Sequence, residues 1–255
     1  MPHLSPGLVV AVVSGKGGTG KSTVSVNLAE TLCETGLAVA LIDADLCQSS
    51  CATLLNEEPP ASVLALARGA VSADRVFHRT ACGVTLVVTG TATRPGGPAP
   101  FLFDALDDVL ETVAQSHDVV LIDAPAGMDD AVRWALDRAH VGLLVLVGEP
   151  TSVTGAYALA KTVWQTVPSY PFLTVVNAAD TDADAVQTAT RFAELTTQFL
   201  GQTPTAAGWL PYDAHVRAAV RDQVPAVRRS PALQAAFAGL ARGLAPLLPS
   251  ARAAA

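Results

Sequence analysis

Residues 14–23 read Ser-Gly-Lys-Gly-Gly-Thr-Gly-Lys-Ser-Thr, and this stretch decides the fold. The pattern G-x-x-x-x-G-K-[ST] places its fixed positions at Gly15, Gly20, Lys21 and Ser22. An apolar run at 7–13 precedes the stretch, and a segment with helical periodicity follows it at 21–34. This is the context of a phosphate-binding loop, so the sequence predicts a strand, a glycine loop and a helix in succession.

Composition indicates one α/β domain over residues 1–255 with a thick core, because half of the residues are apolar and only 15% are charged. The net charge of -7 argues against broad affinity for nucleic acid or anionic membranes. No apolar run reaches the roughly 18–20 residues of a membrane span. No basic segment precedes the first apolar run, so we expect a strand there, not a signal peptide, and a cytoplasmic protein.

Four cysteines occur, and free thiols are the expectation in a reducing compartment. They are Cys33, Cys47, Cys51 and Cys82. Cys47 and Cys51 form the only close pair, for which ordinary packing is favoured over a metal or redox role.

Short apolar runs alternate with helical segments along the chain, which predicts a doubly wound, mostly parallel sheet with helices on both faces. Strands are expected at 7–13, 38–42, 84–89, 119–122, 141–147, 173–176 and 206–210. Helices are expected at 21–34, 62–68, 102–115 and 182–200. A further helix should begin after Thr151, and two more should lie near the C-terminus. In such sheets ligands bind at the carboxyl ends of the strands. The loops after residues 13, 43, 123, 147, 176 and 210 should therefore surround one site.

The glycine loop should bind the phosphates of a nucleotide through backbone N–H groups that point inward. Lys21 should reach the β- and γ-phosphates, Ser22 should bind Mg²⁺, and Thr23 is placed to bond the α-phosphate. The predicted phosphate-binding set comprises Gly15, Gly17, Gly18, Thr19, Gly20, Lys21, Ser22 and Thr23.

Three aspartates follow apolar strands and should converge on this loop. Asp123 ends the run 118–123 and has the position of a Walker-B carboxylate, acting on Mg²⁺ directly or through water. Asp43 and Asp45 end another strand and, two residues apart, should point the same way. One can position metal-bound water and the other can orient the attacking water; a helix cap or turn residue is the alternative for one of them.

Lys16 is a second lysine in a loop that already contains Lys21. A side chain on the loop rim is poorly placed to fold back onto its own γ-phosphate. It is therefore either a solvated loop charge or a group that reaches the phosphates of a facing subunit, as an arginine finger does.

The segment 16–23, Lys-Gly-Gly-Thr-Gly-Lys-Ser-Thr, resembles the deviant Walker A motif of the MinD/ParA ATPases, P-loop NTPases of the SIMIBI type. Asp-Ala-Asp-Leu at 43–46 is similar to the family's switch I, and Asp-Ala-Pro-Ala-Gly at 123–127 to its switch II. Glu-Pro-Thr-Ser-Val-Thr at 149–154 is closest to the FlhG/FleN branch, which controls flagellar number and placement. The similarity extends over about residues 8–245.

This resemblance implies a slow ATPase that forms a homodimer with ATP and Mg²⁺ and serves as a switch for an unidentified regulatory protein partner. The implied catalytic residues are Lys16 acting across the dimer, Lys21, and Asp45 orienting the hydrolytic water. The implied metal residues are Ser22, Asp43 and Asp123. Asn177, Pro211 and Asp213 would hold adenine.

Two other function classes remain open from the sequence. A ParA-like DNA-partition ATPase would use a basic stretch, for which the residues are Arg217, Arg221, Arg228 and Arg229. A metallocofactor-assembly ATPase is less favoured, because such proteins carry cysteines after switch II and here none follows Cys82. The apolar tail at 232–248 is expected to pack on the core and not to attach to a membrane.

Overall fold

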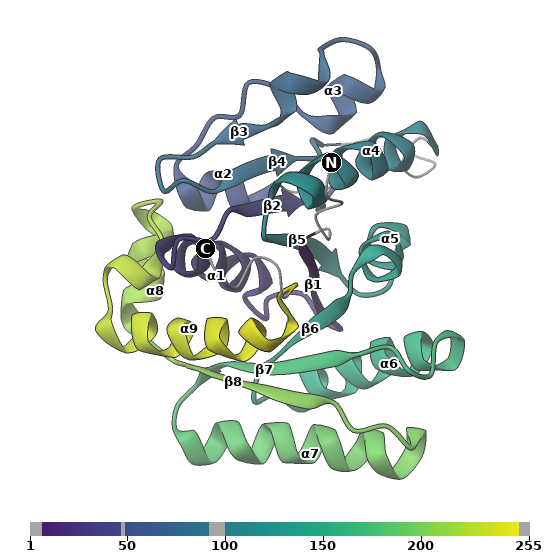
Figure 1. Ribbon diagram of the computed structural model, residues 1–255. Coiled ribbons are helices and arrows are strands. Elements are labelled where there is room, and N and C mark those ends of the chain that lie inside the picture. The colour runs from purple at the N-terminus through teal and green to yellow at the C-terminus, as the bar shows by residue number, and fades with distance from the viewer. Residues whose placement is uncertain (1–6, 47–48, 92–99, 250–255) are drawn as a thin grey trace.

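The computed structural model describes residues 7–46, 49–91 and 100–249. The described strands form one eight-stranded sheet in the order β3-β4-β2-β5-β1-β6-β7-β8, with β3 and β8 at opposite edges (Figure 1). Neighbouring strands are parallel except for the antiparallel pair β3 and β4. Helices cover both faces, so the predicted α/β fold with a doubly wound, mostly parallel sheet is confirmed.

The strands are β1 (Leu8–Ser14), β2 (Val39–Asp43), β3 (His78–Arg79), β4 (Thr85–Val88), β5 (Val119–Ala126), β6 (Val141–Leu146), β7 (Phe172–Ala179) and β8 (Thr205–Pro211). The α-helices are α1 (Lys21–Glu34), α2 (Ser50–Leu55), α3 (Val63–Ala67), α4 (Pro100–Ser116), α5 (Asp130–Arg138), α6 (Pro150–Thr166), α7 (Asp182–Leu200), α8 (Ala214–Arg221) and α9 (Pro231–Leu244). Three short 3₁₀ segments are η1 (Ala73–Val76), η2 (Ala226–Arg228) and η3 (Ala245–Leu247).

Two hydrophobic cores lie on the two faces of the sheet, and the strands contribute to both. In β1, Val9, Ala11 and Val13 belong to the core beneath α4, α5, α6 and α7. The alternate residues of the same strand, such as Val10 and Val12, belong to the core beneath α1 and α9. Side chains alternate along a strand, so a strand that is buried on both faces has to be apolar throughout.

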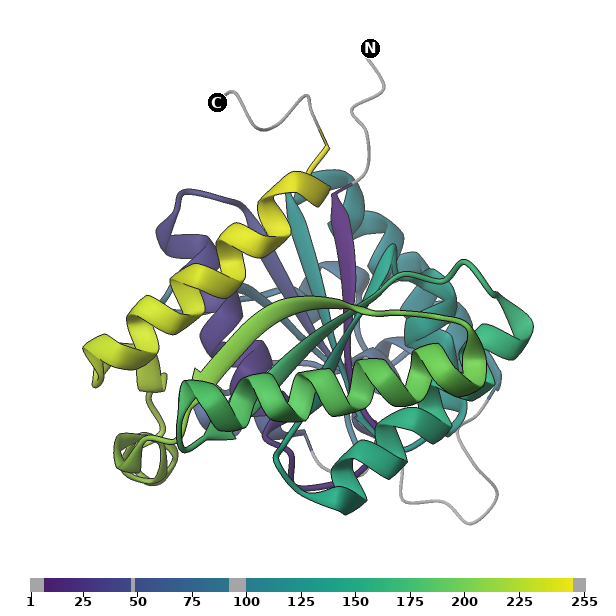
Figure 2. The ribbon, with the colours of Figure 1, turned by 90° about the horizontal axis from the view of Figure 1, so that it is seen from below.

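α1 is itself a buried helix, because it lies against the sheet and α9 packs beside it on the same face, over β8. The two helices lie side by side in both views of the molecule (Figures 1 and 2). Leu233, Phe237 and Leu240 of α9 are buried in the core that α1 shares. The apolar tail therefore packs on the domain, as the sequence predicted. Within the described residues, no helix is both long and apolar enough to cross a membrane.

Several elements differ from the sequence prediction. The helices at 21–34 and 182–200 have the predicted bounds. Helices α2 and α5 were not predicted, because they span only 6 and 9 residues and short helices give little periodicity. Strand β5 continues past the expected end at 122 to Ala126, since its last residue still pairs with Ser14 of β1.

The phosphate loop rests directly on the backbone of α6. A Cβ atom on Gly15 would lie 1.8 Å from the carbonyl carbon of Gly155, and one on Gly155 would lie 2.6 Å from the oxygen of Gly15. No side chain fits between the two segments. Glycine at both positions is therefore a packing requirement of the fold and not a matter of backbone flexibility.

We predict that Gly155→Ala destabilises the protein by about 1–3 kcal/mol, because the added methyl group forces two backbone segments apart. Gly239→Ala is the matched control: Gly239 also lies inside a helix, but a methyl group there would have the side-chain nitrogen of Arg242 as its nearest neighbour, 3.7 Å away. The control should be neutral or stabilising by up to about 1 kcal/mol. Urea unfolding of both variants measures the difference, and equal stabilities would contradict the packing argument.

Candidate functional site

The phosphate loop lies at the carboxyl end of the central strand β1 and leads into the N-terminus of α1. Gly18 and Gly20 have positive φ angles of 80° and 83°, which turn the chain around the space in front of the helix. Thr19 between them is buried, and its hydroxyl has no hydrogen-bond partner among the described residues. Backbone N–H groups at a helix N-terminus together with a buried, unpartnered hydroxyl suit an anionic ligand.

Asn177 of β7 holds the loop from the other side. Its side-chain nitrogen donates to the carbonyl oxygen of Thr19 over 2.8 Å. A Cβ atom on Gly20 would lie 2.4 Å from that same nitrogen. Asn177 was predicted to bind adenine, which stays a prediction; the structure shows that its side chain fixes the phosphate loop.

Asp43 and Asp123 lie next to each other in direct register, Asp43 as the last residue of β2 and Asp123 within β5, three residues before that strand ends. Both are buried, with exposed fractions of 0% and 1%. The hydroxyl of Ser49 donates to Asp43 Oδ2 over 3.0 Å, and the hydroxyl of Ser25 donates to Asp123 Oδ1 over 2.8 Å. The structure thus brings together the two carboxylates that the sequence predicted as metal residues.

Burial dominates the electrostatics of this pair. Burial raises the pKa of Asp43 to about 7, and the charge of Asp123 adds to the rise. Burial likewise raises the pKa of Asp123, against hydrogen bonds from Ser22 and Ser25 and the charge of Lys21. Burial lowers the pKa of Lys21, while Asp123 and Asp45 act in the opposite direction. Two buried carboxylates facing one partly desolvated lysine form a site that a divalent cation would stabilise.

Asp45 lies at the edge of the same site and is half-buried. Its backbone N–H donates to Asp43 Oδ1 over 3.2 Å, and its charge acts on Lys21. The predicted candidates Lys21, Ser22, Asp43, Asp45 and Asp123 are therefore gathered in one place.

Lys16 points away from this cluster and towards the start of α6. Its Nζ donates to Glu149 Oε2 over 2.5 Å and to the hydroxyl of Thr151 over 3.0 Å. Hydrogen bonding from Lys16 also lowers the pKa of Glu149. Neither partner was identified from the sequence, since contacts between residues 133 and 135 positions apart leave no local signal.

A cavity of about 320 Å³ adjoins the phosphate loop and has the place expected for a nucleotide base. Its lining includes Gly20, Thr23, Asn27, Asn177, Ala178, Pro211, Tyr212, Asp213, Arg217 and Phe237. Pro211 and Asp213 were predicted here and do line the cavity. Tyr212, which is 65% exposed, lies between them in the same predicted segment and also lines the cavity. Phe237 of α9 was missed, because its ring is recognisable as a cavity wall only after the chain has folded.

The carboxylate of Asp213 is engaged in local structure. Oδ1 accepts from the backbone N–H of His215 over 2.8 Å, and Oδ2 accepts from the hydroxyl of Ser230. Asp213 thereby caps α8 and holds the residue that precedes α9. A role of Asp213 in binding adenine stays a prediction. To bind adenine, its carboxylate would have to give up or share the hydrogen bonds from His215 and Ser230.

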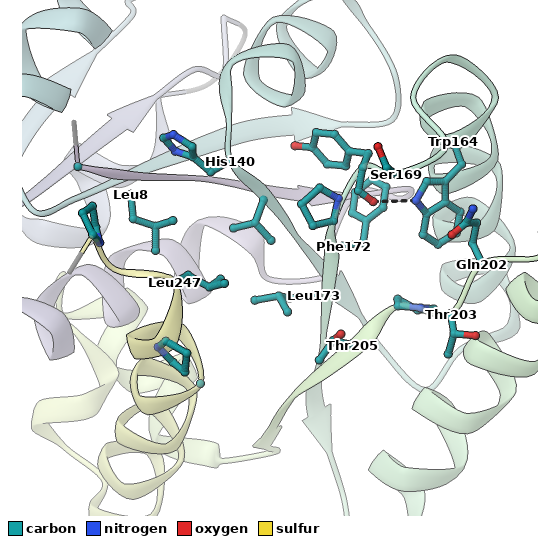
Figure 3. Close-up of a pocket in the computed structure, with 18 residues that line it drawn as sticks. Leu8, His140, Trp164, Ser169, Phe172, Leu173, Gln202, Thr203, Thr205 and Leu247 are labelled. Atoms are coloured by element: carbon teal, nitrogen blue, oxygen red, sulfur yellow. Dashed lines mark hydrogen bonds between the residues drawn. The ribbon is translucent and has the colours of Figure 1, made fainter. Parts of the chain in front are cut away.

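A second, larger cavity lies at the opposite end of the strands and differs in chemistry. It has a volume of about 640 Å³, and its walls include Leu8, Val141, Phe172 and Thr205, near the amino ends of β1, β6, β7 and β8 (Figure 3). None of the described residues that line it carries a carboxylate, an ammonium or a guanidinium group, and the indole N–H of Trp164 is already bonded to the carbonyl oxygen of Tyr170. This cavity does not have the groups that phosphate chemistry needs.

The arginines considered for DNA contact are mostly paired with acidic side chains. Arg228 bonds the buried Glu30, and Arg221 and Arg229 both pair with Asp222. Arg217 is exposed at the rim of the base cavity. The basic stretch therefore does not present four uncompensated charges, and the DNA-binding alternative gains no support from the geometry.

Among the described cysteines, Cys33, Cys51 and Cys82 are free thiols, as expected; Cys47 lies outside the described residues. Cys51 is fully buried, and its thiol lies 3.4 Å from Asp123 Oδ2. Ordinary packing was the expectation for Cys51, and its position beside the two carboxylates could not be read from spacing alone.

Comparisons with known proteins agree with this geometry. Residues 7–236 match the ParA family, described as the NUBPL iron-transfer P-loop NTPase. The chain is 31% identical to the antiactivator FleN of Pseudomonas aeruginosa, over 93% of this chain and 85% of that protein. It is 30% identical to an iron-sulfur cluster carrier protein of Deinococcus radiodurans, over 93% of this chain and 69% of that protein. The septum site-determining protein MinD of Pyrococcus horikoshii, solved with Mg-ADP, superposes with a TM-score of 0.74 at 22% identity, over 94% of this chain and 96% of that one.

We predict that the stability of the metal-free protein falls as the pH rises from about 4 towards 7. The pKa of Asp43 is about 7 in the folded protein, against 3.8 for an ordinary aspartate. Between these values the folded state holds a proton that the unfolded state has lost, so raising the pH favours unfolding. Asp43→Asn should flatten this dependence.

Urea unfolding without metal or nucleotide, at several pH values in this window, measures the effect. Asp104→Asn, at an exposed aspartate of α4, is the matched control and should keep the wild-type slope. If Asp43→Asn and the wild type lose stability in parallel, the pH dependence arises elsewhere.

Proposed function

The chain belongs to the ParA/MinD family of P-loop NTPases, and on this premise we propose that it is an ATPase switch that dimerises with ATP and regulates the number or placement of flagella. The observation that carries the proposal is the pair Asp43 and Asp123, buried beside Lys21 at the end of the phosphate loop. The match to FleN over most of both chains supports the flagellar role.

The site fits the ligands of this family, ATP or ADP with Mg²⁺. The loop offers N–H groups and the buried hydroxyl of Thr19 to phosphate oxygens, and the neighbouring cavity offers room for a base. Ser22, Asp43 and Asp123 supply oxygen atoms, which are the ligands that Mg²⁺ prefers. When bound, the ion would neutralise charge on the phosphates.

Each residue then has a defined part in hydrolysis. Lys21 binds the β- and γ-phosphates, and its partial burial strengthens that attraction. Asp43 and Asp123 hold their positions through the hydroxyls of Ser49 and Ser25. Asp45, at the more accessible edge, orients the attacking water. Positioning and charge stabilisation of this kind are the main means by which proteins catalyse phosphoryl transfer.

Lys16 is the residue that would make the switch dimeric. In the single chain it is exposed enough to be reached by a second subunit, with 40% of its side chain accessible. Exposed ion pairs contribute only about 0–1 kcal/mol, so its contact with Glu149 is readily exchanged for one with a partner's phosphates. Dimer formation would thereby depend on the nucleotide.

A role in iron-sulfur cluster transfer is the second candidate, favoured by the family description and by the Deinococcus relative. Against it, the thiol of Cys33 donates to the backbone oxygen of Cys82, whereas the thiol of Cys51 is buried beside the carboxylate of Asp123. Anaerobic reconstitution with iron and sulfide separates the two proposals. A stable visible absorption that survives gel filtration would favour cluster transfer over the flagellar role.

We predict that Lys16→Ala abolishes dimerisation by ATP and that Asp45→Ala traps the dimer. Lysine removal takes away the group acting across the interface, a kind of contact worth roughly 10³-fold or more in turnover. Loss of Asp45 leaves binding intact and stops the hydrolysis that would separate the subunits. Multi-angle light scattering with Mg-ATP, together with phosphate release, measures both outcomes.

Lys161→Ala removes another exposed lysine, on α6, and serves as the control that should behave as the wild type. An Asp45→Ala protein that still turns over ATP normally would exclude Asp45 from its proposed part. Affinity capture with the trapped Asp45→Ala dimer tests the biological role. Flagellar components should be retained. Retention of division or DNA-partition proteins in place of flagellar components would contradict the flagellar role.

A further inference from the structure

A thiol lies inside the cluster that the proposed function assigns to Mg²⁺. Cys51 is the second residue of α2, and its backbone N–H donates to Asp43 Oδ2 over 2.9 Å. Its sulfur lies 3.4 Å from Asp123 Oδ2, and one ligand atom from each of Asp43, Cys51 and Asp123 lies within 4.8 Å of the other two. Three different elements, β2, α2 and β5, supply these groups, and all three residues are buried.

The spacing matches a thiophilic metal ion. A tetrahedral zinc site has bonds of about 2.3 Å to sulfur and about 2.0 Å to oxygen, which separates those two ligand atoms by about 3.5 Å. In the structure, Cys51 Sγ and Asp123 Oδ2 lie 3.4 Å apart. An ion can therefore take the place of the thiol proton with little movement of either side chain.

The surrounding groups orient the carboxylates as they do in metal centres. Ser25 donates to the Oδ1 atom of Asp123 and leaves Oδ2 facing Cys51. Ser49 and the backbone of Asp45 hold the two oxygens of Asp43. Hydrogen bonds from neighbouring groups fix the direction of metal ligands and are part of their affinity. The cluster is thus held in place before any ion enters.

The donor set selects between cations. Mg²⁺ takes oxygen ligands, whereas thiolate sulfur favours Zn²⁺ and related ions. We propose that Asp43, Cys51 and Asp123 form a binding site for a thiophilic divalent cation of the Zn²⁺ class, which is bound in preference to Mg²⁺ when no nucleotide is present. The ion would occupy the carboxylates that Mg-ATP requires and would therefore inhibit ATP turnover. That inhibition rests on the proposed function, whereas the binding of the ion does not.

The test uses Cd²⁺ as the probe, because cadmium bound to thiolate absorbs in the ultraviolet. The full chain with Cys33→Ser, Cys47→Ser and Cys82→Ser retains Cys51 alone. Titration of this nucleotide-free protein with Cd²⁺ should give a charge-transfer absorption that saturates at one equivalent. Adding Cys51→Ser to the same background should abolish it, and circular dichroism verifies that both proteins are folded.

Two further arms decide whether the carboxylates belong to the site. Asp43→Asn in the single-cysteine protein should weaken Cd²⁺ binding by roughly tenfold or more. Zn²⁺ at low micromolar concentration should displace Cd²⁺, and Mg²⁺ at millimolar concentration should not. No saturable absorption in the folded single-cysteine protein, an unchanged affinity with Asp43→Asn, or displacement by Mg²⁺ as effective as by Zn²⁺ would each overturn the proposal. Because no nucleotide is present, failure here is distinct from an absence of ATP hydrolysis.

Discussion

The burial of two adjacent carboxylates is the constraint around which the rest of the site is organised. Asp43 and Asp123 lie in register on the neighbouring strands β2 and β5, with almost no access to water. Burying such groups costs free energy unless hydrogen bonds or a positive charge offset it. The hydroxyls of Ser25 and Ser49 and the charge of Lys21 offset part of this cost. A bound cation would offset the negative charge that remains.

α1 connects the phosphate loop to the C-terminal elements η2 and α9. Asn27 accepts from the backbone N–H of Val227 over 2.9 Å, and Glu30 pairs with Arg228, so the same helix holds η2. The covering helix α9 follows directly after η2 and lines the base cavity through Phe237. The tail of the chain is therefore a structural part of the candidate nucleotide site as well as a cover for the core.

Most of the framework could be predicted because its signals are local. The phosphate loop has a fixed spacing, and strands buried on both faces are apolar without interruption. Asp43 and Asp123 could be assigned to one site because the carboxyl ends of parallel strands meet at one edge. Glu149, Cys51 and Gly155 could not, since each acquires its role from a partner far away in the chain. Their roles depend on how helices α2 and α6 pack in the folded protein, and no local stretch of sequence predicts that packing.

The contact between Gly15 and Gly155 has a mechanical consequence. Two backbones that touch without an intervening side chain have no rotamers with which to absorb a displacement. The same helix, α6, begins beside Glu149, the residue that holds Lys16. α6 therefore holds the loop at two points, through the backbone of Gly155 and through the residue that precedes the helix, so that a shift of α6 would displace the loop with it.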